Sequence, residues 1–135
     1  MRHIIRVTGW SVALAAILTS HAVVAGRTVD EPETVMITLH VKPGSEDALA
    51  RVIANHWDTA RRLNLVREDE PHMTLRATEG DKSYFVEIFT WRDASIPDAA
   101  PPAILAIWQE MNALVETRDG RPALAIAQMT VVASR

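Results

Sequence analysis

"SYFVEIFTWRD", residues 83–93, is a nearly continuous apolar and aromatic stretch with one carboxylate, Glu87, near its middle. Its β-branched and aromatic residues predict a buried strand. Because side chains alternate along a strand, Phe85, Glu87, Phe89 and Trp91 share one face. A carboxylate on such an apolar face is costly to bury unless it has a partner. This strand therefore predicts both the centre of the fold and a candidate site.

A hairpin joins this strand to the segment before it. "HMTLRA" (72–77) alternates between apolar and polar residues, and the turn "EGDK" (79–82) follows it. A Gly-Asp pair between two such runs is typical of a tight β-turn. The pairing places His72 and Arg76 on the face that carries Glu87, with Arg76 directly or diagonally opposite that carboxylate, depending on the register.

The outer segments complete the pattern. "TVMITLHV" (34–41) is rich in β-branched residues and runs into the turn "KPG", and "ALAIAQMTVV" (123–132) predicts the last strand. Apolar residues at helical spacing predict a first helix over 45–63, with a serine as its N-cap. A second helix is predicted to start in "PDAAPP" (97–102) and to stop at "RDGRP".

This order of elements predicts an α+β fold, the ferredoxin-like βαββαβ sandwich. Right-handed crossovers place both helices on one face of a four-stranded antiparallel sheet. The other face is left without a helix, although neither side of the outer strands is convincingly polar. We therefore expect another subunit to cover that face, which predicts a homodimer.

Residues 1–25 predict a secretory signal peptide. Two arginines precede a short apolar run (9–18), and small residues occupy the −3 and −1 positions of the cleavage site. The apolar run is shorter than the roughly 20 residues that a membrane helix needs, so stable membrane insertion after cleavage is not expected. We expect a periplasmic or secreted protein with a flexible leader (26–34) and one domain (35–135).

The charge of the mature chain argues against two classes of partner. Residues 1–25 contain two of the 14 basic residues and no acidic residue, so cleavage leaves 12 basic against 17 acidic residues, a formal charge of −5. That balance disfavours nucleic acid or an anionic membrane as the main partner. The chain has no cysteine, so no disulfide supports it. No Gly-rich phosphate loop, nucleophile elbow or Walker motif points to nucleotide chemistry.

Three stretches carry a resemblance to a known family. "VMITLHVKPGSEDALARVI" (35–53) and "YFVEIFTWRDAS" (84–95) resemble the first strand, Lys-Pro-Gly turn, first helix and third strand of the antibiotic biosynthesis monooxygenase-like family. "PAILAIWQEMNALVETRDGRP" (102–122) is similar to the second helix of a subset of its members. The resemblance, which spans 35–132, implies a dimeric α/β barrel with a ligand cavity between sheet and helices. It also implies oxygen-dependent oxidation of quinols or polycyclic aromatics without metal or flavin.

The chain keeps one of three site residues that are common in the active enzymes of that family. The resemblance implies Trp91 as the tryptophan near the end of the third strand. The first strand has no Asn, and no histidine follows His72, although the family commonly places one early in the second helix. Haem-degrading relatives use that histidine as an iron ligand, so haem is not expected, and we expect no cofactor.

Glu87 admits two interpretations. It either forms a cross-strand ion pair with Arg76, which offsets the cost of burial, or acts as a general base with a raised pKa. We favour the ion pair because structural pairs perturb charges as readily as catalytic ones. Trp91 and Phe89 either form an aromatic pocket wall that stacks on a flat substrate or cap the core.

Three histidines follow the predicted cleavage site, on three different elements. Their positions show no short-range ligand spacing, so no metal site is expected. His56 lies in the apolar stripe of the first helix and is the preferred acid-base candidate, with His40 second; the alternative for His56 is a hydrogen-bonded core residue. His72 and Trp108 complete the candidates for substrate contact, although Trp108, like Trp57, lies where core packing needs it.

Two functions from different classes fit the sequence. The first is an exported cofactor-independent monooxygenase acting on a quinol or another electron-rich aromatic, with His56 or His40 as base, Arg76 as donor and Trp91 with Phe89 as wall. The second is a non-catalytic dimeric module that binds a small hydrophobic molecule. The absent Asn and helix histidine favour the second, and the resemblance in fold favours the first. Whether the pocket is polar and open or filled by its own side chains discriminates between them.

Overall fold

The computed structural model describes residues 31–133, so the predicted signal peptide and the start of the predicted leader lie outside the described residues. Four strands, two α-helices and a short 3₁₀ helix follow in the order β1 Glu33–His40, α1 Glu46–Arg62, β2 Met73–Glu79, β3 Lys82–Trp91, η1 Ile96–Ala99, α2 Pro102–Leu114 and β4 Leu124–Met129. Between residues 31 and 133, no helix has the length and apolar character needed to cross a membrane.

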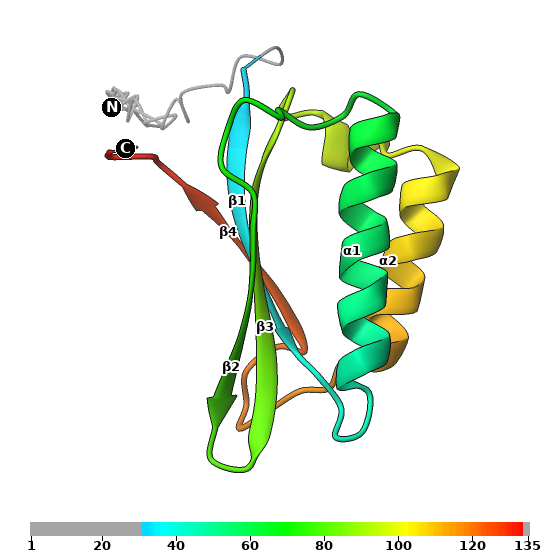
Figure 1. The fold of residues 1–135 in the computed structure, drawn as a ribbon, viewed down its shortest axis with the longest axis vertical. Helices are drawn as coiled ribbons and strands as arrows, with labels where there is room; N and C mark the ends of the chain where they lie inside the picture. Colours follow the sequence, from blue (N-terminus) through cyan, green and yellow to red (C-terminus); the bar gives the residue numbers. More distant parts are fainter. Residues whose placement is uncertain (1–30, 134–135) are drawn as a thin grey trace, which may run out of the picture.

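The arrangement confirms the predicted α+β fold. The strand order is β2-β3-β1-β4, and all three strand pairs are antiparallel. Both helices cover one face of the sheet, whereas no helix covers the other (Figure 1). The core therefore lies between the helices and the two central strands, β1 and β3.

The β2–β3 hairpin has a register that turns Glu87 toward the helices. A two-residue loop joins the strands, and Gly80 within it has a φ of 62°, which glycine adopts without the steric penalty of a Cβ. Thr74 lies opposite Glu87, and Arg76 lies opposite Phe85. The predicted hairpin and shared face are confirmed, and Arg76 occupies the diagonal position relative to Glu87.

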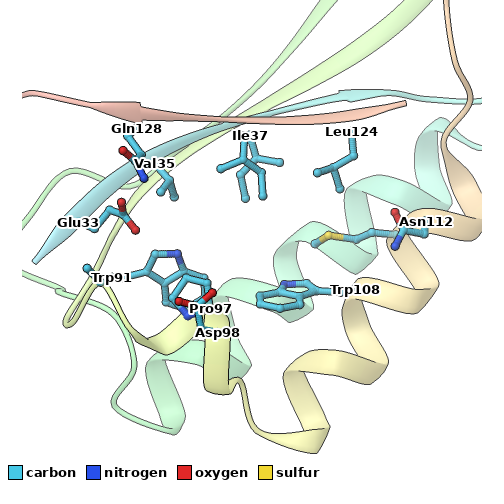
Figure 2. Close-up of a pocket in the computed structure, with 13 residues that line it drawn as sticks. Glu33, Val35, Ile37, Trp91, Pro97, Asp98, Trp108, Asn112, Leu124 and Gln128 are labelled. Carbon is cyan, nitrogen blue, oxygen red and sulfur yellow. The ribbon is translucent and has the colours of Figure 1, made fainter. Parts of the chain in front are cut away.

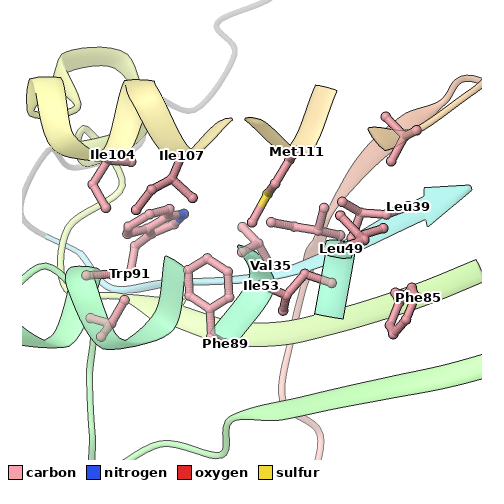
Figure 3. Packing of buried hydrophobic residues seen from close by; sticks show 14 of the residues in the cluster. Val35, Leu39, Leu49, Ile53, Phe85, Phe89, Trp91, Ile104, Ile107 and Met111 are labelled. Carbon is pink, nitrogen blue, oxygen red and sulfur yellow. The ribbon is translucent and has the colours of Figure 1, made fainter. Parts of the chain in front are cut away.

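Apolar side chains fill the space between α1, the first turns of α2 and the central strands. Burial of each large side chain contributes about 1.5–3 kcal/mol, so this layer is the main source of stability. Figure 3 shows how the two helices and the sheet interdigitate, through Leu49, Ile53, Phe85, Phe89, Trp91, Ile104, Ile107 and Met111.

The second helix begins later than its pattern predicts. Ile96–Ala99 form η1, residues 100–101 form an extended break, and α2 starts only at Pro102. Ala100 and Pro101 have ψ values of 139° and 155°. A residue that precedes a proline is pushed out of the helical region, and both of these residues precede one. The break separates η1 from α2.

The sheet face without helices, here called the open sheet face, is largely apolar. Across it, Met36 lies opposite Ile88, which in turn lies opposite Met73. Met73 and Leu75 are 45% and 50% exposed. Exposed apolar area of this kind is typical of interaction sites, which is consistent with the predicted homodimer.

Candidate functional site

A pocket of about 440 Å³ lies between the sheet and the helix layer on the β4 side. The pocket forms at the edge of the sheet, where the helices do not fully cover β4. Ile126 of β4 pairs with Ile37 of β1 and faces the helix layer, yet it is 63% exposed. The apolar walls come from both layers, namely Val35 and Ile37 of β1, Leu124 and Ile126 of β4, and Trp108 and Met111 of α2 (Figure 2).

Two tryptophans form the helix-side wall of the pocket. Trp91 at the end of β3 and Trp108 of α2 both line it, with ring centroids 6.4 Å apart and planes at 79°. Edge-to-face aromatic pairs of this kind are rigid, and an indole face is a good stacking surface for a flat ring. The wall is therefore suited to a planar apolar ligand.

Polar side chains lie at the two ends of the pocket. Glu33, Asp98 and Gln128 lie toward the end closed by Trp91, and Asn112 lies at the other end beside Trp108 (Figure 2). Among the described residues that line the pocket, none is Lys, Arg or His. The site can therefore offer carboxylates as proton acceptors and amides as hydrogen-bond donors, around an apolar middle.

A buried polar network lies directly behind the tryptophan wall. Trp108 Nε1–H donates to His56 Nε2 over 3.1 Å. His56 Nδ1 lies 3.3 Å from Glu87 Oε2, and His72 Nε2 lies 3.5 Å from Glu87 Oε1. Glu87 is 0% exposed, and within residues 31–133 its ion-pair contacts are with these two histidines.

The contacts of His56 fix its tautomer and hold Glu87 ionised. An indole nitrogen only donates, so His56 Nε2 is the acceptor, and the ring proton of neutral His56 sits on Nδ1 and points at Glu87. Burial acts to raise the pKa of the Glu87 carboxyl, but the contacts with His56 and His72 outweigh it and lower that pKa below its usual value. The general-base alternative requires a raised pKa, and these contacts act in the opposite direction.

The predicted ion pair between Arg76 and Glu87 is wrong. The Arg76 guanidinium donates to the Ser83 hydroxyl over 3.2 Å and lies 5.9 Å from the centroid of the Phe85 ring. β2 is an edge strand, so a long side chain on it reaches solvent more easily than the buried Glu87. The helix residue His56 supplies the partner that the hairpin does not.

The remaining candidates divide between the pocket and other places. Trp91 and Trp108 line the pocket, as the substrate-binding prediction requires. Phe89 is fully buried in the core, and His72 stacks on Trp57 with ring centroids 3.8 Å apart. Neither of them is among the residues that line the pocket.

The two predicted acid-base histidines do not line the pocket either. His56 is buried behind Trp108, and His40 lies on the open sheet face, opposite Tyr84. His40 Nδ1 is 2.8 Å from the Pro122 carbonyl oxygen, which makes it a hydrogen-bonded structural residue. No group of three or more metal-ligating side chains occurs within residues 31–133.

Four polar residues of the pocket were not predicted: Glu33, Asp98, Asn112 and Gln128. A signal existed for two of them. Gln128 continues the alternation that puts Leu124 and Ile126 on the inner face of β4, and Asn112 follows Trp108 by one helical turn. Asp98 could not be placed from the pattern because the break before α2 moves it.

Solved structures share this architecture. SnoaB of Streptomyces nogalater, a cofactor-independent oxygenase, superposes with a TM-score of 0.56 at 21% identity and covers 77% of this chain and 96% of its own. A Pseudomonas aeruginosa protein matches at 18% identity (TM-score 0.56, 78% of this chain, 99% of that one). An antibiotic biosynthesis monooxygenase matches at 17% identity (TM-score 0.56, 75% and 99%).

Neither a protein-family model nor a curated protein sequence matches the chain. The structural likeness spans nearly the full length of each of these proteins and, at such low sequence identities, it shows a common fold alone. The chain thus has the α+β ferredoxin-like fold of a group of solved proteins that includes a cofactor-independent oxygenase and an antibiotic biosynthesis monooxygenase.

Proposed function

We propose that this protein is a cofactor-independent monooxygenase that oxidises a quinol or another electron-rich aromatic in the pocket between β1, β4 and α2. The observation that carries the proposal is an apolar cavity that is open and has a wall of two tryptophans, Trp91 and Trp108. Its volume falls in the range of small-molecule sites. The shared fold with a cofactor-independent oxygenase supports the same reaction class by analogy.

The proposed reaction balances without a cofactor. For an anthrone, the ring CH₂ loses both hydrogens and becomes a carbonyl, one atom of O₂ enters that carbonyl, and the other leaves as water. The substrate supplies all the electrons once it is deprotonated. The protein then has to bind the flat ring, accept a proton and donate hydrogen bonds to the developing oxyanion.

The pocket contains groups for each of these tasks. Trp91 and Trp108 bind the ring, and the amides of Asn112 and Gln128 are the donors for the oxyanion. Because His56 and His40 lie outside the pocket, the proton acceptor in this proposal is a carboxylate, Glu33 or Asp98. Comparing Glu33→Gln with Asp98→Asn identifies which one acts, since only the acceptor's variant loses turnover while it still binds substrate.

Oxygen uptake tests the function directly. The purified mature chain is mixed with anthrone or a hydroquinone in the presence of a metal chelator, and uptake that saturates with substrate is expected. Ile126→Trp fills the pocket from an exposed position and should abolish uptake. Leu105→Trp adds the same indole at a 45% exposed site on α2 that does not line the pocket, and should leave uptake unchanged.

A binding module is the second candidate, and the position of the histidines favours it. The side chains best suited to proton transfer at neutral pH lie behind the pocket or on the open sheet face. Saturable binding of a naphthohydroquinone that Ile126→Trp blocks, without oxygen uptake above the uncatalysed rate, would establish this alternative. Absence of both binding and uptake would reject the pocket as a ligand site.

We further propose that the protein is exported and works as a homodimer. The predicted signal peptide supports export, and cell fractionation tests it. The exposed Met73 and Leu75 of the open sheet face support pairing with a second copy. Light scattering should report a dimer, and Leu75→Glu should shift it to a folded monomer. A monomeric mature wild-type chain at micromolar concentration would contradict the proposal.

A further inference from the structure

We propose that Glu87 and His56 form a positioning pair that holds the indole of Trp108 in the pocket wall only while His56 is neutral, so that uptake of one proton by His56 weakens ligand binding. The inference rests on the proposed function in one respect, the role of the pocket as a ligand site. Its structural half, the coupling between His56 and Trp108, stands without a ligand.

The single hydrogen bond of Trp108 decides how its ring is presented. The side chain is half-buried between the pocket and the core, and its Nε1–H points away from the pocket to His56 Nε2. An indole has one donor, so turning the ring over would leave that donor without His56 as its acceptor. The bond to His56 therefore selects which face and edge of Trp108 the pocket presents.

Glu87 makes His56 the correct acceptor. The carboxylate lies 3.3 Å from Nδ1 and accepts a hydrogen bond from the ring N–H there, which leaves Nε2 with a free lone pair for Trp108. Without a partner at Nδ1, the neutral ring could carry its proton on either nitrogen, and one of these tautomers cannot accept from Trp108. Glu87 thus acts on the wall through His56 and touches neither the pocket nor Trp108 itself.

Protonation of His56 reverses the contact with Trp108. The imidazolium carries a proton on both nitrogens, so two donors face each other across the 3.1 Å that separates Nε2 from the indole nitrogen. The bond cannot survive, and Trp108 is free to turn. Loss of one hydrogen bond of ordinary strength in the wall corresponds to an affinity about fivefold lower.

His56 is the titratable group that contacts Trp108 directly, and its other neighbours come from β3. From β3, Glu87 is the charged neighbour, and Phe89 and Trp91 pack edge-on against the imidazole with ring centroids at 5.5 and 6.0 Å. From α2 the neighbour is the uncharged Trp108. His72 contacts the second oxygen of Glu87, and at 24% exposure it connects the buried carboxylate to solvent.

A titration of the ligand-free wild-type protein tests the coupling. The indole N–H signal of Trp108 is assigned by its loss in Trp108→Phe and is followed by NMR from neutral to acidic pH beside the ring-carbon signal of His56. We expect the two signals to shift with one midpoint. A Trp108 signal that stays fixed while His56 titrates would overturn the inference, and the measurement needs no core variant to fold.

Binding of a naphthohydroquinone under nitrogen, where no turnover occurs, tests the consequence for the pocket. The dissociation constant should rise about fivefold across the same pH range. A dissociation constant that does not follow His56 overturns the inference even if the protein binds and oxidises the quinol. If no quinol binds, the proposed function fails, and the Trp108 signal alone still decides whether the pair positions the indole.

Two variants separate Glu87 from its neighbours. Glu87→Gln keeps the size of the side chain but replaces a carboxylate, which only accepts, by an amide that can also donate to Nδ1. The tautomer of His56 is then no longer fixed, and the joint titration of His56 and Trp108 should be lost. His72→Gln is the matched control, because it alters the other side of Glu87 and leaves the His56–Trp108 bond in place. It should preserve the joint titration of the two signals. A joint titration that is lost in His72→Gln but kept in Glu87→Gln would show that Glu87 does not position His56, and it would overturn the inference.

Discussion

The layer between sheet and helices is filled in one half and hollow in the other. Under α1, the space above β3 is packed with Phe85, Phe89 and Ile53 and admits one polar cluster around Glu87. Under α2, the space above β4 and the outer part of β1 holds the pocket. The same sheet and the same kind of helix therefore produce two different interiors.

The position of each strand in the sheet explains the difference. β3 is a central strand with ten residues, whereas β4 is an edge strand with six, and η1 with the break at Ala100 and Pro101 takes the place of a first turn of α2. In the filled half, every buried polar atom needs a designated partner. In the hollow half, polar side chains can face water or a ligand. The same kind of substitution should therefore destabilise the protein much more in the filled half than in the hollow half.

The largest expected effect comes from breaking the polar cluster of the filled half. Glu87→Ala opens a cavity and leaves the buried N–H of His56 without its acceptor, so it should lower the free energy of unfolding by about 3–5 kcal/mol. The matched truncation in the hollow half, Asn112→Ala, should change it by less than about 0.5 kcal/mol. Urea unfolding of both variants measures the contrast, and similar losses in the two would contradict it.

Larger side chains should also destabilise the filled half more than the hollow half, but the difference in unfolding free energy should be smaller. Ala60 is completely buried, so Ala60→Leu overpacks the filled half and should cost about 1–3 kcal/mol of unfolding free energy. Leu124→Phe adds volume inside the pocket and should cost less than about 0.5 kcal/mol. Thermal unfolding at one scan rate compares them. A destabilised Leu124→Phe would mean that the hollow half is closed in solution.

The smallest effect is a pH dependence that Glu87 should give to the filled half. The pKa of Glu87 is lower in the folded protein than the usual value of 4.5 for a glutamate, so its contribution to stability is complete above that usual value. The contribution is lost as the pH falls through the lower folded pKa, because the unfolded chain then binds the extra proton first. Urea midpoints measured at a series of acidic pH values should fall less steeply for Glu87→Gln than for wild type, and Asn112→Ala should follow the wild-type curve.

The filled half could be predicted from the sequence to a large extent. Alternation along 83–91 placed Phe85, Glu87, Phe89 and Trp91 on one face, and the Gly-Asp turn set the hairpin. These features depend on neighbours along the chain and on the two-residue period of a strand. The stripe of α1 likewise placed His56 toward the sheet.

The pairing inside that half could not be predicted. Glu87 contacts His56, 31 residues away, because α1 lies over β3 at one particular rotation. The sequence pattern specifies which face of the helix is apolar but not which residue meets Glu87, and the cross-strand neighbour Arg76 was the local alternative. The resemblance implied a cavity between sheet and helices, but the polar lining of the pocket was not predicted, since it results from the displaced start of α2 and the exposed inner face of β4.

The segment from Asp93 to Pro102 determines how rigid the rim of the pocket is. The Asp93 carboxylate accepts hydrogen bonds from both the backbone N–H and the hydroxyl of Ser95, over 2.7 Å each, and three prolines follow within seven residues. Prolines have few alternative backbone conformations, so this rim of the pocket is shaped before anything binds. Ordering this rim on binding therefore costs little conformational entropy, so a small rigid ligand can bind even if it makes few contacts.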